Sequence, residues 1–198
     1  RGCSTYHTSY PYSVLLLLAI GLCGTMSLKH VALEKIRETI NLLRKSNISS
    51  ELNTDGKSVL SVLKELQDRV RYSDAGPIDP KALLLPFLRM IRSQTISGPY
   101  VRKAIESIQS FLLGDILLGD PQHTCDALDE IVVAITRCRF VLTDVQGDEM
   151  VQLHMLETLR IIVTTANSEF LNDATQWHIL HFCCLNLTKA GGGNGSML

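Results

Sequence analysis

The stretch DPKALLLPFLRMIRSQTISGPYVRKAIESIQSFLLGD, residues 79–115, decides the fold class of this chain. Asp79-Pro80 and Ser97-Gly98-Pro99 each place a residue that caps helices well shortly before a proline, which suits the first turn of a helix. In the residues that follow each proline, apolar side chains recur at helical spacing. Gly114 or Gly119 offers a stop to the second run. The stretch therefore predicts two consecutive helices joined by a short loop.

Helical patterns continue on both sides of this stretch. Further apolar stripes begin near Leu28, Asp55-Gly56-Lys57, Asp120-Pro121, Asp148-Glu149 and Asp173. Helix starts at intervals of roughly 20 to 25 residues are typical of helix pairs that stack into a solenoid. We therefore predict an all-α fold, an armadillo/HEAT-like α-solenoid of about seven helices. A compact helical bundle fits the same rhythm almost as well.

The two ends of the chain differ in composition from the middle. Residues 1–25 are rich in Tyr, Ser and Thr, and their apolar run at 14–24 is shorter than the roughly 20 residues that span a bilayer. We interpret residues 1–25 as an atypical, disordered segment before a natural start at Met26. Residues 26–188 then form the helical domain, and residues 189–198 a flexible, Gly-rich tail. The alternative is a secreted or lumenal helical protein, because the run has the length of a signal-peptide core.

The composition and motifs point away from catalysis. The net charge of −1 argues against a nucleic-acid partner, and the six cysteines show no C-x-x-C spacing and are expected to be free thiols. The sequence contains no phosphate-binding loop and no nucleophile elbow, so we expect no catalytic residue, cofactor or metal. One alternative uses His178, His181 and Cys184 as metal ligands. Another is a small Cys/His enzyme, which needs a pocket joining Cys183 or Cys184 to His181.

Three blocks carry a family resemblance. They are FLRMIRS at 87–93 with the following SGP, AITRCRFVLTD at 134–144, and DEMVQLHML at 148–156. In order and spacing they resemble the N-terminal dimerisation and cyclophilin-binding domain of the large Golgi exchange factors for Arf GTPases, of the brefeldin-A-resistance type. The resemblance covers residues 28–162, and the stretch from Trp177 onward departs from it.

The resemblance implies a non-catalytic regulatory module. Such a module self-associates, docks to the downstream homology region of its parent factor and acts in the cytoplasm, peripherally on Golgi membranes. A Rab GTPase or a cyclophilin is a further candidate partner. No exchange domain is recognised in the sequence, so we expect no enzyme activity.

The candidate interface residues are Arg139, Asp144, Asp148 and Glu149. A functional reading places Asp148 and Glu149 on an exposed corner between a loop and a helix, used for self-association or for docking the neighbouring domain. A structural reading of the same residues is also open. Asp148 and Glu149 suit the cap and first turn of a helix. Arg139 suits the end of the preceding helix, and Asp144 suits a turn.

Overall fold

The computed structural model describes residues 13–45, 53–54, 57–72, 78–142 and 145–191 of the 198-residue chain. In these ranges the chain forms seven α-helices, one 3-10 helix and one short hairpin. In chain order they are α1 (Ser13–Arg44), β1 (Asn53–Thr54), β2 (Lys57–Ser58), α2 (Val59–Tyr72), α3 (Pro80–Arg92), α4 (Gly98–Leu113), α5 (Pro121–Thr136), α6 (Val145–Thr164), η2 (Ala166–Phe170) and α7 (Asp173–Gly191). The prediction of an all-α fold with about seven helices is confirmed.

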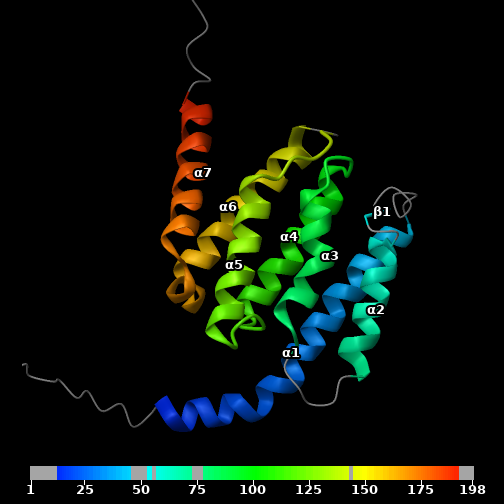
Figure 1. Ribbon diagram of the computed structural model, residues 1–198, viewed down its shortest axis with the longest axis vertical. Coiled ribbons are helices and arrows are strands. Elements are labelled where there is room, and N and C mark those ends of the chain that lie inside the picture. Colours follow the sequence, from blue (N-terminus) through cyan, green and yellow to red (C-terminus); the bar gives the residue numbers. More distant parts are fainter. Residues whose placement is uncertain (1–12, 46–52, 55–56, 73–77, 143–144, 192–198) are drawn as a thin grey trace, which may run out of the picture.

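The helices pack in two layers (Figure 1). One layer contains α1, α4 and α6 side by side, and the other contains α2, α3, α5 and α7. Across the layers, α1 packs on α2, α3 on α4, and α5 on α6. Each helix thus contacts its neighbours in the stack, which is the arrangement of a solenoid.

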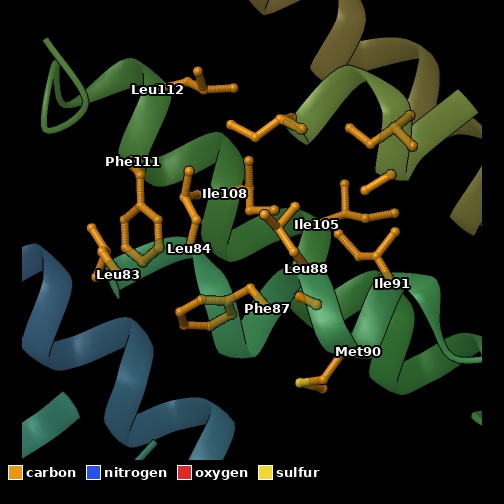
Figure 2. Packing of buried hydrophobic residues seen from close by; sticks show 14 of the residues in the cluster. Leu83, Leu84, Phe87, Leu88, Met90, Ile91, Ile105, Ile108, Phe111 and Leu112 are labelled. Carbon is orange, nitrogen blue, oxygen red and sulfur yellow. The ribbon is translucent and has the colours of Figure 1, made fainter. Parts of the chain in front are cut away.

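The centre of the core lies between α3 and α4, the two helices predicted from residues 79–115. Leu84, Phe87, Ile108 and Phe111 are all 0–1% exposed and face one another there (Figure 2). The Phe87 and Phe111 rings meet edge to face, with centroids 5.3 Å apart. Such a pair adds about 0.5–1.5 kcal/mol beyond the burial of its surface. The helix pair that the sequence marks most clearly therefore anchors the fold.

Caps explain where the central helices begin. The Asp79 carboxylate accepts a hydrogen bond from the Lys81 backbone N–H at 3.0 Å, and Asp120 accepts one from Gln122 at 3.0 Å. Both satisfy N–H groups that the first turn of a helix leaves unpaired. Ser97 occupies the same position before α4 without a side-chain bond. These three predicted helix starts are confirmed.

α4 ends at Leu113, and Gly114, one of the two predicted stops, is the residue directly after it. The backbone adopts the left-handed conformation not at this glycine but at Asp115, which has a φ of 53°. The Ile116 N–H donates to the Phe111 carbonyl at 3.1 Å, which closes a Schellman-type helix end around Asp115. Asp tolerates this backbone conformation better than most residues, because its short polar side chain bonds locally.

The outer helices are longer than predicted. α1 begins at Ser13 rather than after Met26, so the assignment of residues 13–25 to a disordered segment was wrong. Leu and Ala favour helix, and no proline interrupts 13–44. In Figure 1 the first turns of α1 extend away from the packed helices. α7 continues to Gly191, beyond the tail boundary predicted at 189. Residues 1–12 and 192–198 lie outside the described ranges.

Two further helix starts differ from prediction. α2 begins at Val59, because Ser58 ends the hairpin and its hydroxyl accepts the Ser61 N–H at 3.2 Å as a cap. α6 begins at Val145, so Asp148 lies within its first turn instead of opening the helix.

Candidate interaction surfaces

The corner predicted as an interface is formed by the loop after α5 and the first turns of α4 and α6. The Val141 N–H donates to the Ile96 carbonyl at 2.9 Å, and Val141 also bridges to Ser97. The half-buried ring of Phe140 packs against the core below. The loop is therefore held beside the N-terminus of α4.

The four candidate residues differ in exposure. Arg139 and Glu149 are exposed, whereas Asp148 retains only 8% of its accessible surface. Asp144 lies outside the described residues. The corner thus brings Arg139 and Glu149 to the surface, and the expectation that Asp148 is exposed there was wrong.

Asp148 is buried because α6 crosses closely over the start of α4. A Cβ atom added at Gly98, the first residue of α4, would lie 3.0 Å from Asp148 Oδ1 and 3.3 Å from Val151 Cγ2. A carboxylate is favoured there, since the N-terminus of a helix carries partial positive charge. The close approach supports a structural role for Asp148 in joining α4 and α6.

The outer face of α6 carries apolar side chains. Helical periodicity alone does not decide which apolar residues of this helix are buried, and the structure separates them into two sets. Val151 and Leu159 belong to the buried set. Leu153 is 57% exposed, Leu156 37% and Val163 44%. The signal that could have found this second set is a heptad-like spacing on the face opposite to the core.

A second apolar surface lies on α7, the last helix of its layer. Trp177, the only tryptophan of the chain, is 66% exposed, and Leu180 is 60% exposed. Trp177 stacks on His181 with ring centroids 6.5 Å apart. The outer surface of α7 therefore offers a large aromatic side chain together with leucine.

The base of α7 is fixed to α5 by polar contacts. The Asp129 carboxylate accepts hydrogen bonds from Asn172 Nδ2, at 2.8 Å to its Oδ2, and from the Thr175 hydroxyl. Asn172 Oδ1 in turn accepts the Thr175 backbone N–H at 2.9 Å, which caps the helix. Thr175 is 3% exposed, so these contacts are shielded from water.

A groove of about 510 Å³ runs between α3 and α5. Leu84, Leu88 and Val133 are among the residues that line it. Lys81 Nζ bonds to Asp126 Oδ2 at 2.8 Å, and Arg92 pairs with Glu130, so ion pairs bridge the two helices. The hydrogen bond from Lys81 lowers the pKa of Asp126 below its usual value of 3.8. These exposed pairs contribute little stability but help to align the helices.

In the part of the chain that the structure describes, no group of three or more His, Cys, Asp or Glu could hold a metal ion. Burial raises the pKa of Cys138 to about 12, so its thiol is a poor nucleophile at neutral pH. The groove between α3 and α5 is lined by neither His181 nor Cys183 and Cys184. Among the helices in the described ranges, none combines the length and the apolar character needed to cross a bilayer.

The fold and these surfaces define a class of protein, an all-helical solenoid with exposed apolar surfaces in its described part. No protein-family model matches the chain. It is 31% identical over 143 residues to ARF guanine-nucleotide exchange factor GNL2 of Arabidopsis thaliana, which is 71% of this chain and 10% of that protein. ARF guanine-nucleotide exchange factor 1 of Saccharomyces cerevisiae is 29% identical over 118 residues, 58% of this chain and 8% of that protein.

A Caenorhabditis elegans protein, the Golgi-specific brefeldin A-resistance guanine nucleotide exchange factor 1 homolog, is 25% identical over 61% of this chain and 6% of its own length. By sequence, the chain is homologous to a segment of the Arf guanine-nucleotide exchange factors. It spans about a tenth of the length of the curated relatives it matches.

Proposed function

We propose that this chain is a non-catalytic interaction module of a large Arf guanine-nucleotide exchange factor. The module self-associates and docks to a neighbouring regulatory region of its parent polypeptide. The observation that carries the proposal is the uneven distribution of exposed apolar side chains. Most of the exposed large apolar side chains in the described part lie on α6 and α7, whereas every exposed residue of α1 between His30 and Arg44 is polar.

This asymmetry distinguishes the two ends of the helix stack. Repeat solenoids need terminal repeats with a polar outer face to remain soluble. The exposed positions of α2 are also polar, apart from Tyr72. The α6–α7 end lacks this polar character, and an exposed apolar patch of this kind is typical of a protein-binding surface.

Self-association is tested by light scattering of the full chain across a concentration series. An average mass that rises toward that of a dimer supports the proposal. A strictly monomeric mass at every concentration contradicts self-association.

Docking is tested separately with Trp177. The immobilised chain is offered the yeast ARF guanine-nucleotide exchange factor 1 from which the matching segment has been removed. We expect retention by the unchanged chain and weaker retention by Trp177→Ser. Tyr72→Ser is the matched control, because Tyr72 is a 75% exposed aromatic residue on the opposite end of the stack. Equal retention by all three proteins would contradict docking through α7.

The module regulates the exchange reaction without performing it. The chain is therefore expected to leave the release of a fluorescent GDP analogue from Arf at its spontaneous rate. A rate that increases with chain concentration would contradict this part of the proposal.

The proposed place of action is the cytoplasmic face of Golgi membranes, where the module associates peripherally as part of its parent factor. The name of the Caenorhabditis elegans relative, a Golgi-specific brefeldin A-resistance factor homolog, supports this location. A Rab GTPase and a cyclophilin are the further candidate partners. We expect the tagged chain to co-localise with a Golgi marker. A diffuse distribution without co-localisation would contradict the proposed location.

A further inference from the structure

The groove between α3 and α5 has an apolar lining. Leu84, Leu88 and Ala127 form part of it and are at most 5% exposed. Leu85 is 41% exposed there, and the half-buried Val133 lies on the α5 side. The volume of about 510 Å³ is within the range of ligand-binding pockets. All of its lining residues belong to α3 and α5, so the groove is a surface separate from those on α6 and α7.

The charges that line the groove are separated by helix. Its basic residues, Lys81 and Arg92, belong to α3, and its acidic residues, Asp126, Asp129 and Glu130, belong to α5. The Asp129 carboxylate already accepts hydrogen bonds from the start of α7. The α3 edge of the groove therefore carries two cations, and the α5 edge carries two carboxylates that a partner can reach.

The ion pairs between the two edges can exchange their partners. Lys81 Nζ lies 2.8 Å from Asp126 Oδ2, and Arg92 pairs with Glu130. These four side chains retain 36–56% of their accessible surface. Exposed ion pairs contribute little net stability, so a partner that brings charges of its own replaces them at small cost. The charges of both edges are therefore available for recognition.

The shape of the groove favours a helix as its occupant. From Lys81 to Arg92, α3 advances about 16 Å at 1.5 Å per residue. An amphipathic helix inserts apolar side chains at positions i, i+4 and i+7 into such a groove, and these three span about 10 Å. An extended peptide gains its affinity by pairing with the edge of a sheet, which two helices do not offer.

We propose that the groove between α3 and α5 binds an amphipathic helix of a partner protein, with acidic side chains along one flank of that helix and basic side chains along the other. The acidic flank lies along α3 and faces Lys81 and Arg92. The basic flank lies along α5 and faces Asp126 and Glu130. Charge also fixes the direction of the bound helix, because turning it end to end exchanges its two flanks. This binding is independent of self-association and of docking through α7.

The test titrates the full chain into labelled synthetic peptides of about 18 residues, long enough to form a helix, and follows their fluorescence anisotropy. All peptides share one leucine stripe. The first has glutamate on one flank and lysine on the other, the second has glutamate on both flanks, and the third has lysine on both. The first should bind with a dissociation constant on the order of tens of micromolar, since the groove is smaller than a standard interface. The other two should bind on the order of fivefold more weakly, because each places one flank against like charges.

Two variants locate the binding in the groove. K81Q/R92Q/D126N/E130Q removes the charges of both edges without changing the net charge, so it should bind the three peptides with similar affinity. Leu85→Gln should weaken binding of the first peptide on the order of fivefold, because it removes an apolar contact. Its matched control is Leu113→Gln, at a 62% exposed leucine that ends α4, which should bind like the unchanged chain. Circular dichroism checks that each variant retains its helix content.

Four outcomes overturn the proposal. The first is that the peptide with mixed flanks does not bind, and the second is that the unchanged chain binds all three peptides equally. The third is a preference among the peptides that survives in the quadruple variant. The fourth is equal binding by Leu85→Gln and Leu113→Gln. None of these outcomes alters the mass of the chain in solution or its retention through Trp177, so the proposed function is tested separately.

Discussion

The attachment of α7 depends on the carboxylate of Asp129, and its removal should release this helix from α5. Asp129 accepts hydrogen bonds from Asn172 Nδ2, at 3.0 and 2.8 Å to its two oxygens, and from the Thr175 hydroxyl. In Asp129→Ala the Thr175 hydroxyl keeps Asn172 Oδ1, at 3.0 Å, as its alternative acceptor. The Asn172 amide loses its charged acceptor within a half-buried site.

The cost of Asp129→Ala follows from the hydrogen bonds that it removes. A buried donor that loses its acceptor costs about 1–3 kcal/mol, and more when the acceptor is charged. Two donors are affected and one keeps an alternative, so we expect about 2–4 kcal/mol. Ile179 is the buried apolar residue among the described side chains of α7, so few other contacts offset the loss. A loss of 2 kcal/mol shifts the opening equilibrium of the helix about 30-fold.

Hydrogen exchange followed by mass spectrometry measures this opening. In Asp129→Ala the amides of α7 should exchange at least about 30-fold faster, while those of α3 and α4 keep their protection. Asp129→Asn should have a smaller effect, because its amide oxygen still accepts one of the hydrogen bonds. Unchanged exchange of α7 in Asp129→Ala would refute the reasoning, and uniform acceleration in all helices would show that α7 does not open independently.

Three further predictions concern a helix end, a close helix contact and an ion pair. Asp115→Gly should raise the free energy of unfolding by about 0.5–1 kcal/mol, because glycine adopts positive φ without strain, whereas Asp115→Ala should not raise it. Urea denaturation measures both variants. Gly98→Ala should lower the free energy of unfolding by about 1–3 kcal/mol in the same assay, because the new methyl carbon would lie 3.0 Å from Asp148 Oδ1. The hydrogen bond from Lys103 lowers the pKa of Glu38 below 4.5. Glu38 therefore stabilises the fold above pH 4.5 and loses this effect as the pH falls through its lower folded pKa, so a pH series of unfolding curves should be flatter for Glu38→Gln than for the unchanged chain.

The central part of the fold was predictable because its signals are local. Asp79 and Asp120 lie next to the prolines that begin their helices, and each cap bond spans only two residues. The boundaries at Ser13, Val145 and Gly191 were not predictable in this way. Residue types that can begin or end a helix occur near all three, such as Pro11, Asp144 and Gly191. They do not single out one boundary, because a helix continues as long as its residues tolerate it.

The interface role of the candidate residues stays a prediction, but the structure shows which of them are accessible. Arg139 and Glu149 are both exposed. The sequence could not show that Asp148 faces α4, because that contact depends on Gly98, fifty residues earlier in the chain. The polar anchor of α7 likewise joins Asp129 to residues 43 and 46 positions away.

The sequence by itself determined the helical class, the central helix starts and the relation to Arf exchange factors, because these follow from neighbouring residues and from short motifs. Only the tertiary structure decided which of two apolar sets on α6 is buried. Val151 and Leu153 are equally apolar, and helical periodicity fits either set. The packing of α4 against one face buries Val151 and leaves Leu153 in water. Burial is a property of the neighbours that the fold supplies, so the surface available to a partner emerges only when the helices are stacked.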